Sequence, residues 1–382
     1  MTRAQFPDRP IDGWSRLTAA VPNFISRILF AETTSACRVD PGDLFQIGCR
    51  LKDLAPTTEK FWDGWRTAWR DLAEELLAGI DDGSPPAIQR RILRRAAAAN
   101  HWGQFLFFSD LAAKRQDRYH IRQLWEESLR SLERPAPVEV VPPDSAGWGH
   151  ILLHPASRPP WPWTVLFNGL DSSSEVEAVT VAERIVQHGV AVLIPDFPGS
   201  GLGLADRPRP ADLLSRLEEQ APVWKSDPRL HRWAFGYAGI SFGGTIALGL
   251  GLRGAGDPAA VLNYSGGAAV PPTVRLPRRL SLEFATVFDV ESDALDDRLS
   301  EFDLSRQWSN LKVPTLSLVG QFDDIFPAAD LLAADAQSDH HRTIVVPSEG
   351  HMFLNSLDRH LNLGAAWLAS ALRSKLPPEG EP

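Results

Sequence analysis

The chain is organised around one segment, Phe235-Gly236-Tyr237-Ala238-Gly239-Ile240-Ser241-Phe242-Gly243-Gly244-Thr245. Its centre reads G-x-S-x-G. The apolar, aromatic residues before this centre have strand character, and residues 245–250 have the apolar character of a buried helix. A sharp turn between a strand and a helix holds a serine in a strained backbone conformation above a sheet. The segment therefore predicts that Ser241 is a nucleophile.

Small residues around the serine fit this prediction. Gly239 and Gly243 stand two positions on either side of Ser241, where they would let the strand and the helix approach closely. The Phe242 N–H would lie at a helix N-terminus, where it can stabilise an oxyanion. A serine between glycines also occurs in ordinary loops, so the pentapeptide alone leaves both interpretations open.

Composition excludes several classes of protein. The 382 residues are 43% hydrophobic and 23% charged, as in a soluble globular protein. A formal net charge of −9, without a block of Lys or Arg, argues against a nucleic-acid partner. Cys37 and Cys49 lie outside any metal-ligand spacing, so we expect no metal site. The start of the chain lacks an apolar signal core, and no apolar run spans a bilayer, so we expect no membrane partner and a cytoplasmic location.

The first third of the chain differs from the rest. Residues 1–135 carry little strand signal, and apolar residues recur at helical spacing in three segments, 61–77, 88–108 and 119–129. The sequence therefore predicts two regions, a helical lid or cap over residues 1–135 and a catalytic domain over residues 136–382.

From residue 136 onward, strands and helices alternate. We expect two antiparallel strands first, followed by buried strands that are apolar throughout, as parallel strands are. The expected strands are 138–141, 149–154, 163–167, 189–194, 233–237, 259–264, 315–319 and 343–346. This alternation predicts a doubly wound, mainly parallel α/β sheet. We expect His340 and His341, which precede the last strand, to lie in a solvated turn.

A glycine-rich run, Gly199-Ser200-Gly201-Leu202-Gly203, ends the fourth of these strands. It lacks the lysine of a phosphate-binding loop, and Leu204 stands where a dinucleotide-binding motif requires its last glycine. We therefore expect no nucleotide and no other cofactor.

A nucleophilic serine needs a base and a carboxylate that orients the base. On a sheet of this kind, both should follow later strands, in the order Ser, Asp or Glu, His. Asp323 and Asp324 follow the strand that ends at Val319, and His351 follows the strand that ends at Val346. We assign Asp323 as the orienting acid, because Asp324 faces the start of the next helix and fits a capping role. Two capping aspartates without catalysis remain the alternative.

The second oxyanion donor should come from the turn after the third strand. That turn is Asn168-Gly169-Leu170, and its candidate donor is the Leu170 N–H.

These motifs resemble the α/β-hydrolase superfamily over residues 138–375. The turns N-G-L-D-S at 168–172 and D-F-P-G-S-G at 196–201 resemble a group within it. That group contains the fermentation-respiration switch esterase-like proteins, 2,6-dihydroxypseudooxynicotine hydrolase and the fungal polyketide-shortening hydrolases. The resemblance implies that the N-terminal helices form a lid, and that cleavage of a carbon–carbon bond next to a ketone is possible. It also makes a homodimer plausible.

The resemblance also implies substrate contacts. An acidic residue after the Gly-Leu of the oxyanion turn lies near the substrate in the group, and here that residue is Asp171; a role in capping the next helix fits it equally well. We expect Trp102 and Phe105 of the lid to cover the site. The reason is that the segment from Ala268 to Ser305 contains few large apolar residues and would not exclude water by itself.

The function expected from these residues and this resemblance is that of a serine hydrolase. It would cleave an ester, or a carbon–carbon bond next to a ketone, in an aromatic or polyketide-like small molecule. One alternative is an acyltransferase or cyclase with the same triad. Another is a binding protein on a hydrolase scaffold, against which the complete set of Ser241, Asp323 and His351 argues.

Overall fold

The computed structural model describes residues 38–54, 59–105, 107–130, 137–143, 148–206 and 208–376. Contacts between residues divide the chain into two compact units, Met1–Glu133 and Arg134–Pro382. Each unit is described by itself.

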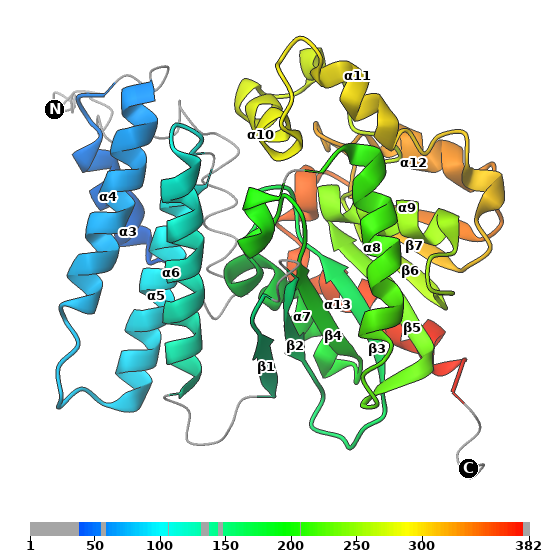
Figure 1. Cartoon of the computed structure of the whole chain (residues 1–382), viewed down its shortest axis with the longest axis horizontal. Coiled ribbons are helices and arrows are strands. Elements are labelled where there is room, and N and C mark those ends of the chain that lie inside the picture. The colour runs from blue at the N-terminus through cyan, green and yellow to red at the C-terminus, as the bar shows by residue number, and fades with distance from the viewer. Residues whose placement is uncertain are drawn as a thin grey trace, which may run out of the picture. The chain divides into compact units, whose positions relative to one another are not determined.

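The described part of the first unit consists of helices. Figure 1 shows them in blue and cyan as α3 (Pro41–Arg50), α4 (Glu59–Leu77), α5 (Pro86–Gln104) and α6 (Leu111–Arg130). Helix α5 packs against both α4 and α6. It begins with Pro86, at a position where the missing N–H would have no helical acceptor. The three helices predicted from apolar spacing are present, although α5 ends at Gln104 and not at residue 108.

Tryptophan rings fill the core of this unit. Four of them are almost completely buried, Trp65, Trp69, Trp102 and Trp125. The Trp65 indole donates a hydrogen bond of 2.6 Å to the Trp102 carbonyl, which ties α4 to α5. The rings of Trp102 and Phe105 meet edge to face at 5.6 Å, and Phe105 is also buried. These aromatic residues therefore belong to the core of the helical unit.

The second unit is built on an eight-stranded sheet in the order β1-β2-β4-β3-β5-β6-β7-β8. The strands are β1 (Val138–Val141), β2 (Gly149–Leu153), β3 (Trp161–Phe167), β4 (Ala191–Asp196), β5 (Leu230–Ile240), β6 (Ala260–Tyr264), β7 (Thr315–Gly320) and β8 (His341–Val346). Strand β2 is antiparallel to both β1 and β4, and all other neighbours are parallel. The predicted doubly wound, mainly parallel sheet is confirmed.

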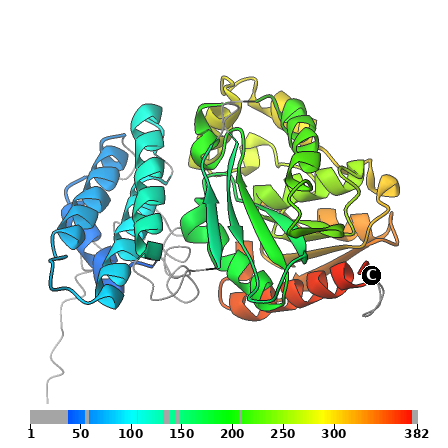
Figure 2. The same cartoon turned by 60° about the horizontal axis from the view of Figure 1, so that its bottom comes forward.

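Helices cover both faces of this sheet. The long ones are α7 (Val179–Gln187), α8 (Pro210–Trp224), α9 (Phe242–Arg253), α10 (Arg278–Phe288), α12 (Ala328–Asp335) and α13 (Leu357–Arg373). The short ones are η1 (Ser174–Ala178), η2 (Gly201–Ala205), η3 (Thr273–Arg275), α11 (Leu295–Leu299), η4 (Ser300–Phe302), η5 (Trp308–Asn310) and η6 (His351–Phe353). Helix α13, red in Figure 2, packs beside α7, whereas α8 packs beside α9.

Large apolar side chains hold the central strands together. Trp163 of β3 packs against Phe235 of β5 with ring centroids 4.5 Å apart, and Phe167 packs against Tyr237 at 6.0 Å. All four are buried. Because β5 leads directly into Ser241, this packing fixes the strand that presents the serine.

Among the described residues, none of the helices has both the length and the apolar composition needed to cross a membrane.

The prediction for His341 is wrong. His341 is the first residue of β8 and is buried, and its ring lies 4.9 Å from that of Trp308. Its Nδ1 lies 2.6 Å from an Asp335 carboxylate oxygen and its Nε2 lies 2.9 Å from Ser317 Oγ. The strand begins at His341, two residues before the expected start at Thr343, because these polar contacts satisfy the imidazole inside the protein.

Burial lowers the pKa of the His341 imidazole, and the charge of Asp335, the charged group against the ring, opposes this in part. The unfolded chain, in which histidine titrates near about 6.5, therefore takes up this proton at a higher pH than the folded chain. The free energy of unfolding should consequently fall as pH drops below about 6.5.

We expect a smaller fall in His341→Gln, which keeps an acceptor oxygen but does not titrate. Urea unfolding of both proteins at about pH 7.5 and about pH 5.5 measures the difference. Equal pH dependence in the two proteins would show that His341 is protonated equally in the folded and unfolded states.

Candidate active site

The turn at Ser241 is as tight as the sequence predicts. Strand β5 ends at Ile240, α9 begins at Phe242, and Ser241 between them has φ 54° and ψ −125°. A Cβ on Gly239 would collide with the Gly243 carbonyl, and a Cβ on Gly243 would collide with the end of β3. Glycine is therefore required at both positions so that the helix can approach the sheet and the serine can stand at its edge.

Three side chains meet at the carboxyl edge of the sheet. His351 Nε2 lies 3.0 Å from Ser241 Oγ, and His351 Nδ1 lies 2.9 Å from Asp323 Oδ2. Ser241 follows β5, Asp323 follows β7 and His351 follows β8. The structure thus brings together the serine, the acid and the base that the sequence singles out.

The carboxylate defines the direction of these hydrogen bonds. Asp323 Oδ1 accepts from the N–H groups of Ile325 and Phe326, at 3.0 and 2.8 Å, so Oδ2 is free to accept from His351 Nδ1–H. With the proton on Nδ1, the neutral ring offers Nε2 as an acceptor for the Ser241 hydroxyl. This is the arrangement in which a histidine can withdraw a proton from serine.

The two neighbouring aspartates differ in their surroundings. The Asp323 side chain is fully buried against His351, whereas Asp324 is exposed. The capping role expected of Asp324 is not seen, since α12 begins after Pro327 without a side-chain cap.

The candidate oxyanion donors follow the ends of two adjacent strands, β3 and β5. Phe242 is the first residue of α9, where no helical carbonyl can accept its N–H. Leu170 lies in the turn after β3, the strand beside β5, and backbone carbonyls of Phe167 and Asn168 press against Gly243 of α9. The two candidates therefore belong to segments that are in direct contact.

Asn168 supports this turn in a way that the sequence did not reveal. Its side-chain amide donates 2.9 Å to Ser174 Oγ, which joins the two ends of the turn. Neither η1 nor α7, which follow this turn, has a side-chain cap at its N-terminus. Asp171 is buried within the same turn.

Aromatic side chains surround the residue that follows the serine. The Phe242 ring meets Phe284, Phe288 and Phe302 edge to face at 5.3, 6.0 and 5.1 Å. All three come from the segment between β6 and β7, and all are buried. Residues 268–305 therefore place three large apolar side chains against the residue that follows Ser241, more than the sequence analysis expects of this segment.

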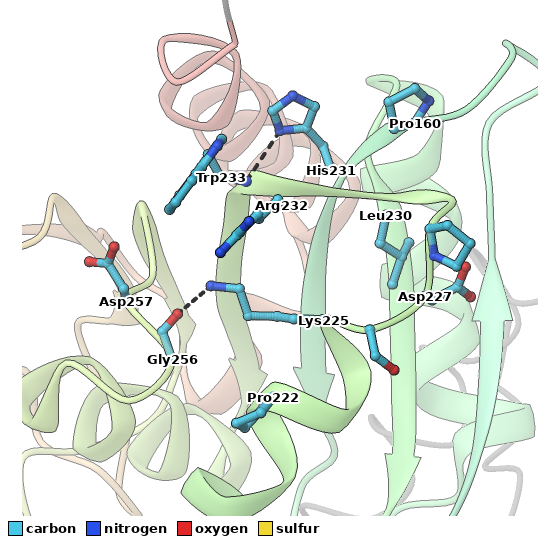
Figure 3. Close-up of a pocket in the computed structure, with 12 residues that line it drawn as sticks. Pro160, Pro222, Lys225, Asp227, Leu230, His231, Arg232, Trp233, Gly256 and Asp257 are labelled. Atoms are coloured by element: carbon cyan, nitrogen blue, oxygen red, sulfur yellow. Dashed lines mark hydrogen bonds between the residues drawn. The ribbon is translucent and has the colours of Figure 1, made fainter.

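A separate pocket of 810 Å³ lies at the amino end of β5 (Figure 3). Lys225 points across it to the Gly256 carbonyl, which accepts a hydrogen bond of 2.5 Å. The Arg232 guanidinium lies 4.8 Å from the ring centre of Trp233. None of the three side chains of the candidate triad lines this pocket, which is at the opposite end of the strand from Ser241.

Within the described ranges, no three His, Cys, Asp or Glu side chains are grouped so that they could hold a metal ion.

No protein-family model matches the chain, and no curated protein matches it in sequence. Solved structures do resemble it. The crystal structure of 2,6-dihydroxy-pseudo-oxynicotine hydrolase has a TM-score of 0.72 and 19% identity, covering 93% of this chain and 98% of that one. AbyA5 has a TM-score of 0.63 and 15% identity, covering 82% and 92%.

A third similar structure is that of the alpha/beta hydrolase GrgF from Penicillium sp. sh18. It has a TM-score of 0.50 and 14% identity, and covers 62% of this chain and 98% of that one. This likeness, the strand order and the elbow at Ser241 together identify the architecture. The chain has the α/β-hydrolase fold.

Proposed function

We propose that this protein is a serine hydrolase that works through an acyl-enzyme. The observation that carries the proposal is the continuous hydrogen-bonded chain from Ser241 through His351 to Asp323, at 3.0 and 2.9 Å, on a strained elbow. A serine hydroxyl is a weak nucleophile, and it becomes effective when a histidine held in the correct tautomer takes its proton.

In the proposed reaction, Ser241 Oγ attacks the substrate carbonyl carbon while its proton moves to His351 Nε2. Asp323 stabilises the resulting imidazolium without taking the proton itself. The Phe242 and Leu170 N–H groups donate to the oxyanion of the tetrahedral intermediate. Collapse of the intermediate expels the leaving group, which receives the proton from His351. Water, activated by the same histidine, then releases the acyl group.

The proposed substrates are small molecules with an ester, or with a carbon–carbon bond next to a ketone, in an aromatic or polyketide-like framework. For carbon–carbon cleavage, the leaving carbanion must be stabilised by a neighbouring carbonyl or arene until His351 protonates it. The aromatic cluster beside Ser241 suits such apolar substrates. The likeness to 2,6-dihydroxy-pseudo-oxynicotine hydrolase supports the same choice.

A second candidate function is acyl transfer or cyclisation by the same three residues. The buried phenylalanines around Phe242 favour it, because a site with little water allows another nucleophile to take the acyl group. Product analysis with and without an added alcohol or amine distinguishes transfer from hydrolysis.

Further parts of the proposal concern binding and location. Asp171, Trp102 and Phe105 are proposed to contact the substrate, with the helical unit acting as a lid. We also propose a cytoplasmic location and a homodimer.

Ser241→Ala should abolish turnover, because it removes the nucleophile and leaves the backbone of the elbow unchanged. We expect a loss of about a thousandfold or more in kcat for a p-nitrophenyl ester. Thermal unfolding followed by circular dichroism controls for folding. Activity close to that of the unaltered protein would contradict the serine mechanism and support the binding-protein alternative.

Asp323→Asn should reduce kcat far more than Asp324→Asn. Only the Asp323 carboxylate contacts His351, and an amide there can hold the imidazole in the wrong tautomer. The two variants are matched in chemistry and adjacent in sequence, so they are compared directly in the same ester assay. A larger effect of Asp324→Asn would show that Asp323 is not the orienting acid.

A chain that begins at Pro137 tests the proposed lid. Without the helical unit, we expect an exposed apolar surface, poor solubility and loss of activity on large aromatic esters. The ratio of kcat/KM for a naphthyl ester to that for p-nitrophenyl acetate measures the effect. An unchanged ratio in the shortened chain would exclude a role of the helices in substrate binding.

A further inference from the structure

A line of polar side chains crosses three neighbouring strands of the otherwise apolar sheet. Asn263 of β6 is paired in register with Ser317 of β7, and His341 begins β8 on the other side of β7. Asn263 and Ser317 are fully buried, and the His341 side chain has no exposed surface. Polar groups in such a position are tolerated only when they have hydrogen-bond partners.

Each of these side chains does have partners. Asp335, at the end of α12, lies 2.6 Å from His341 Nδ1, and His341 Nε2 lies 2.9 Å from Ser317 Oγ. Asn263 Nδ2 donates 3.1 Å to the same Ser317 oxygen. Thr343 holds the Asp335 carboxylate in place, because it donates to it through both its N–H and its hydroxyl, at 3.0 and 2.9 Å.

The direction of the hydrogen bonds is determined along the whole line. The Asp335 carboxylate accepts from His341 Nδ1–H, so the neutral ring accepts at Nε2 from the Ser317 hydroxyl. The Ser317 oxygen then accepts from the Asn263 amide. An imidazolium would instead donate at Nε2, and the Ser317 hydroxyl would then lose its acceptor. The arrangement therefore fits neutral His341.

At its inner end the line reaches the turn after β6. Asn263 Oδ1 accepts 2.7 Å from the Gly266 N–H, and its second amide hydrogen goes to the Gly266 carbonyl at 2.9 Å. The Asn263 amide lies so close to Gly244 and Gly266 that a Cβ on either glycine would collide with it. The amide thus lies between this turn and the first turn of α9.

The end of β6 and the turn that follows it are bonded to Ser241 and to the neighbour of His351. The Tyr264 carbonyl, at the end of β6, accepts 2.8 Å from the Ser241 N–H. In the turn, Ser265 Oγ accepts 3.0 Å from the N–H of Met352, the residue that follows His351. Ser265 and Met352 both have positive φ, at 54° and 64°, so neither backbone conformation is one that the residue itself favours.

We propose that Asp335, His341, Ser317 and Asn263 are positioning residues that hold the turn 264–267, and through it the backbones of Ser241 and His351. The link to catalysis rests on the function proposed above, whereas the link to backbone position does not. The line repeats the Asp-His-Ser order of the candidate triad, but its serine is fully buried and already bonded on both sides. The line therefore positions the backbone and takes no part in the reaction.

Ser317→Ala is the decisive change, because it separates His341 from Asn263 and removes only one oxygen atom. The matched control is Thr315→Val, which removes a buried hydroxyl from the same strand. The Thr315 hydroxyl donates 3.0 Å to the Val313 carbonyl and is outside the line. His341→Leu breaks the line one residue further out and provides a second test if Ser317→Ala fails to fold.

Two measurements are made on each full-length protein. Hydrogen–deuterium exchange is followed in peptides covering residues 262–268 and 349–354, with residues 149–153 of β2 as a distant reference. The rate of labelling of Ser241 by a fluorophosphonate is followed as a function of pH. We expect Ser317→Ala to accelerate exchange about tenfold in the first two segments and not in β2. Its plateau labelling rate should fall about 10- to 100-fold, as small misplacements of reacting groups do.

Each outcome decides a different point. Unchanged exchange in residues 349–354 of Ser317→Ala, or equal effects of Thr315→Val, would overturn the proposal. Faster exchange throughout the second unit would overturn it as well, because it would show general destabilisation. If the unaltered protein is not labelled but exchange changes as expected, the positioning role stands and the serine-hydrolase function fails.

Discussion

The close approach of α9 to the end of β3 is the constraint on which the site depends. It exists because Gly243 has no side chain to hold the helix away from the Phe167 and Asn168 carbonyls. The approach brings the Phe242 N–H and the turn containing Leu170 to the same edge of the sheet. It also requires Ser241 to take a backbone conformation that a serine does not favour, which the surrounding strands must hold in place.

The sequence was sufficient to predict the doubly wound sheet and the meeting of Ser241, Asp323 and His351. Each of these residues lies at or shortly after the end of an apolar strand, and parallel strands end at the same edge of a sheet, so local patterns carried the long-range information. His341 could not be placed in this way. Its neighbours are polar, and its burial depends on Asp335 and Ser317, which lie on other elements.

The aromatic cluster around Phe242 was missed for a related reason. Phe284 and Phe288 lie one turn apart on α10, but Phe242 and Phe302 come from other elements, and only the path of the chain brings the four rings together. The sequence likewise places Asn263 only within the expected strand 259–264, because no local pattern shows that its amide lies between Gly244 and Gly266. The sequence shows periodicity within one element, but it does not show contacts between elements.

The placement of the phenylalanine cluster bears on how the site can change. All three rings that pack on Phe242 belong to one continuous excursion between β6 and β7, which leaves and re-enters the sheet on adjacent strands. The nucleophile, the acid and the base lie outside that excursion. The aromatic residues that pack on the neighbour of the nucleophile therefore come from a single insertion. Exchange of that insertion between members of the fold would change the packing around Phe242, in evolution or by recombination in the laboratory, while the reacting groups stay in place.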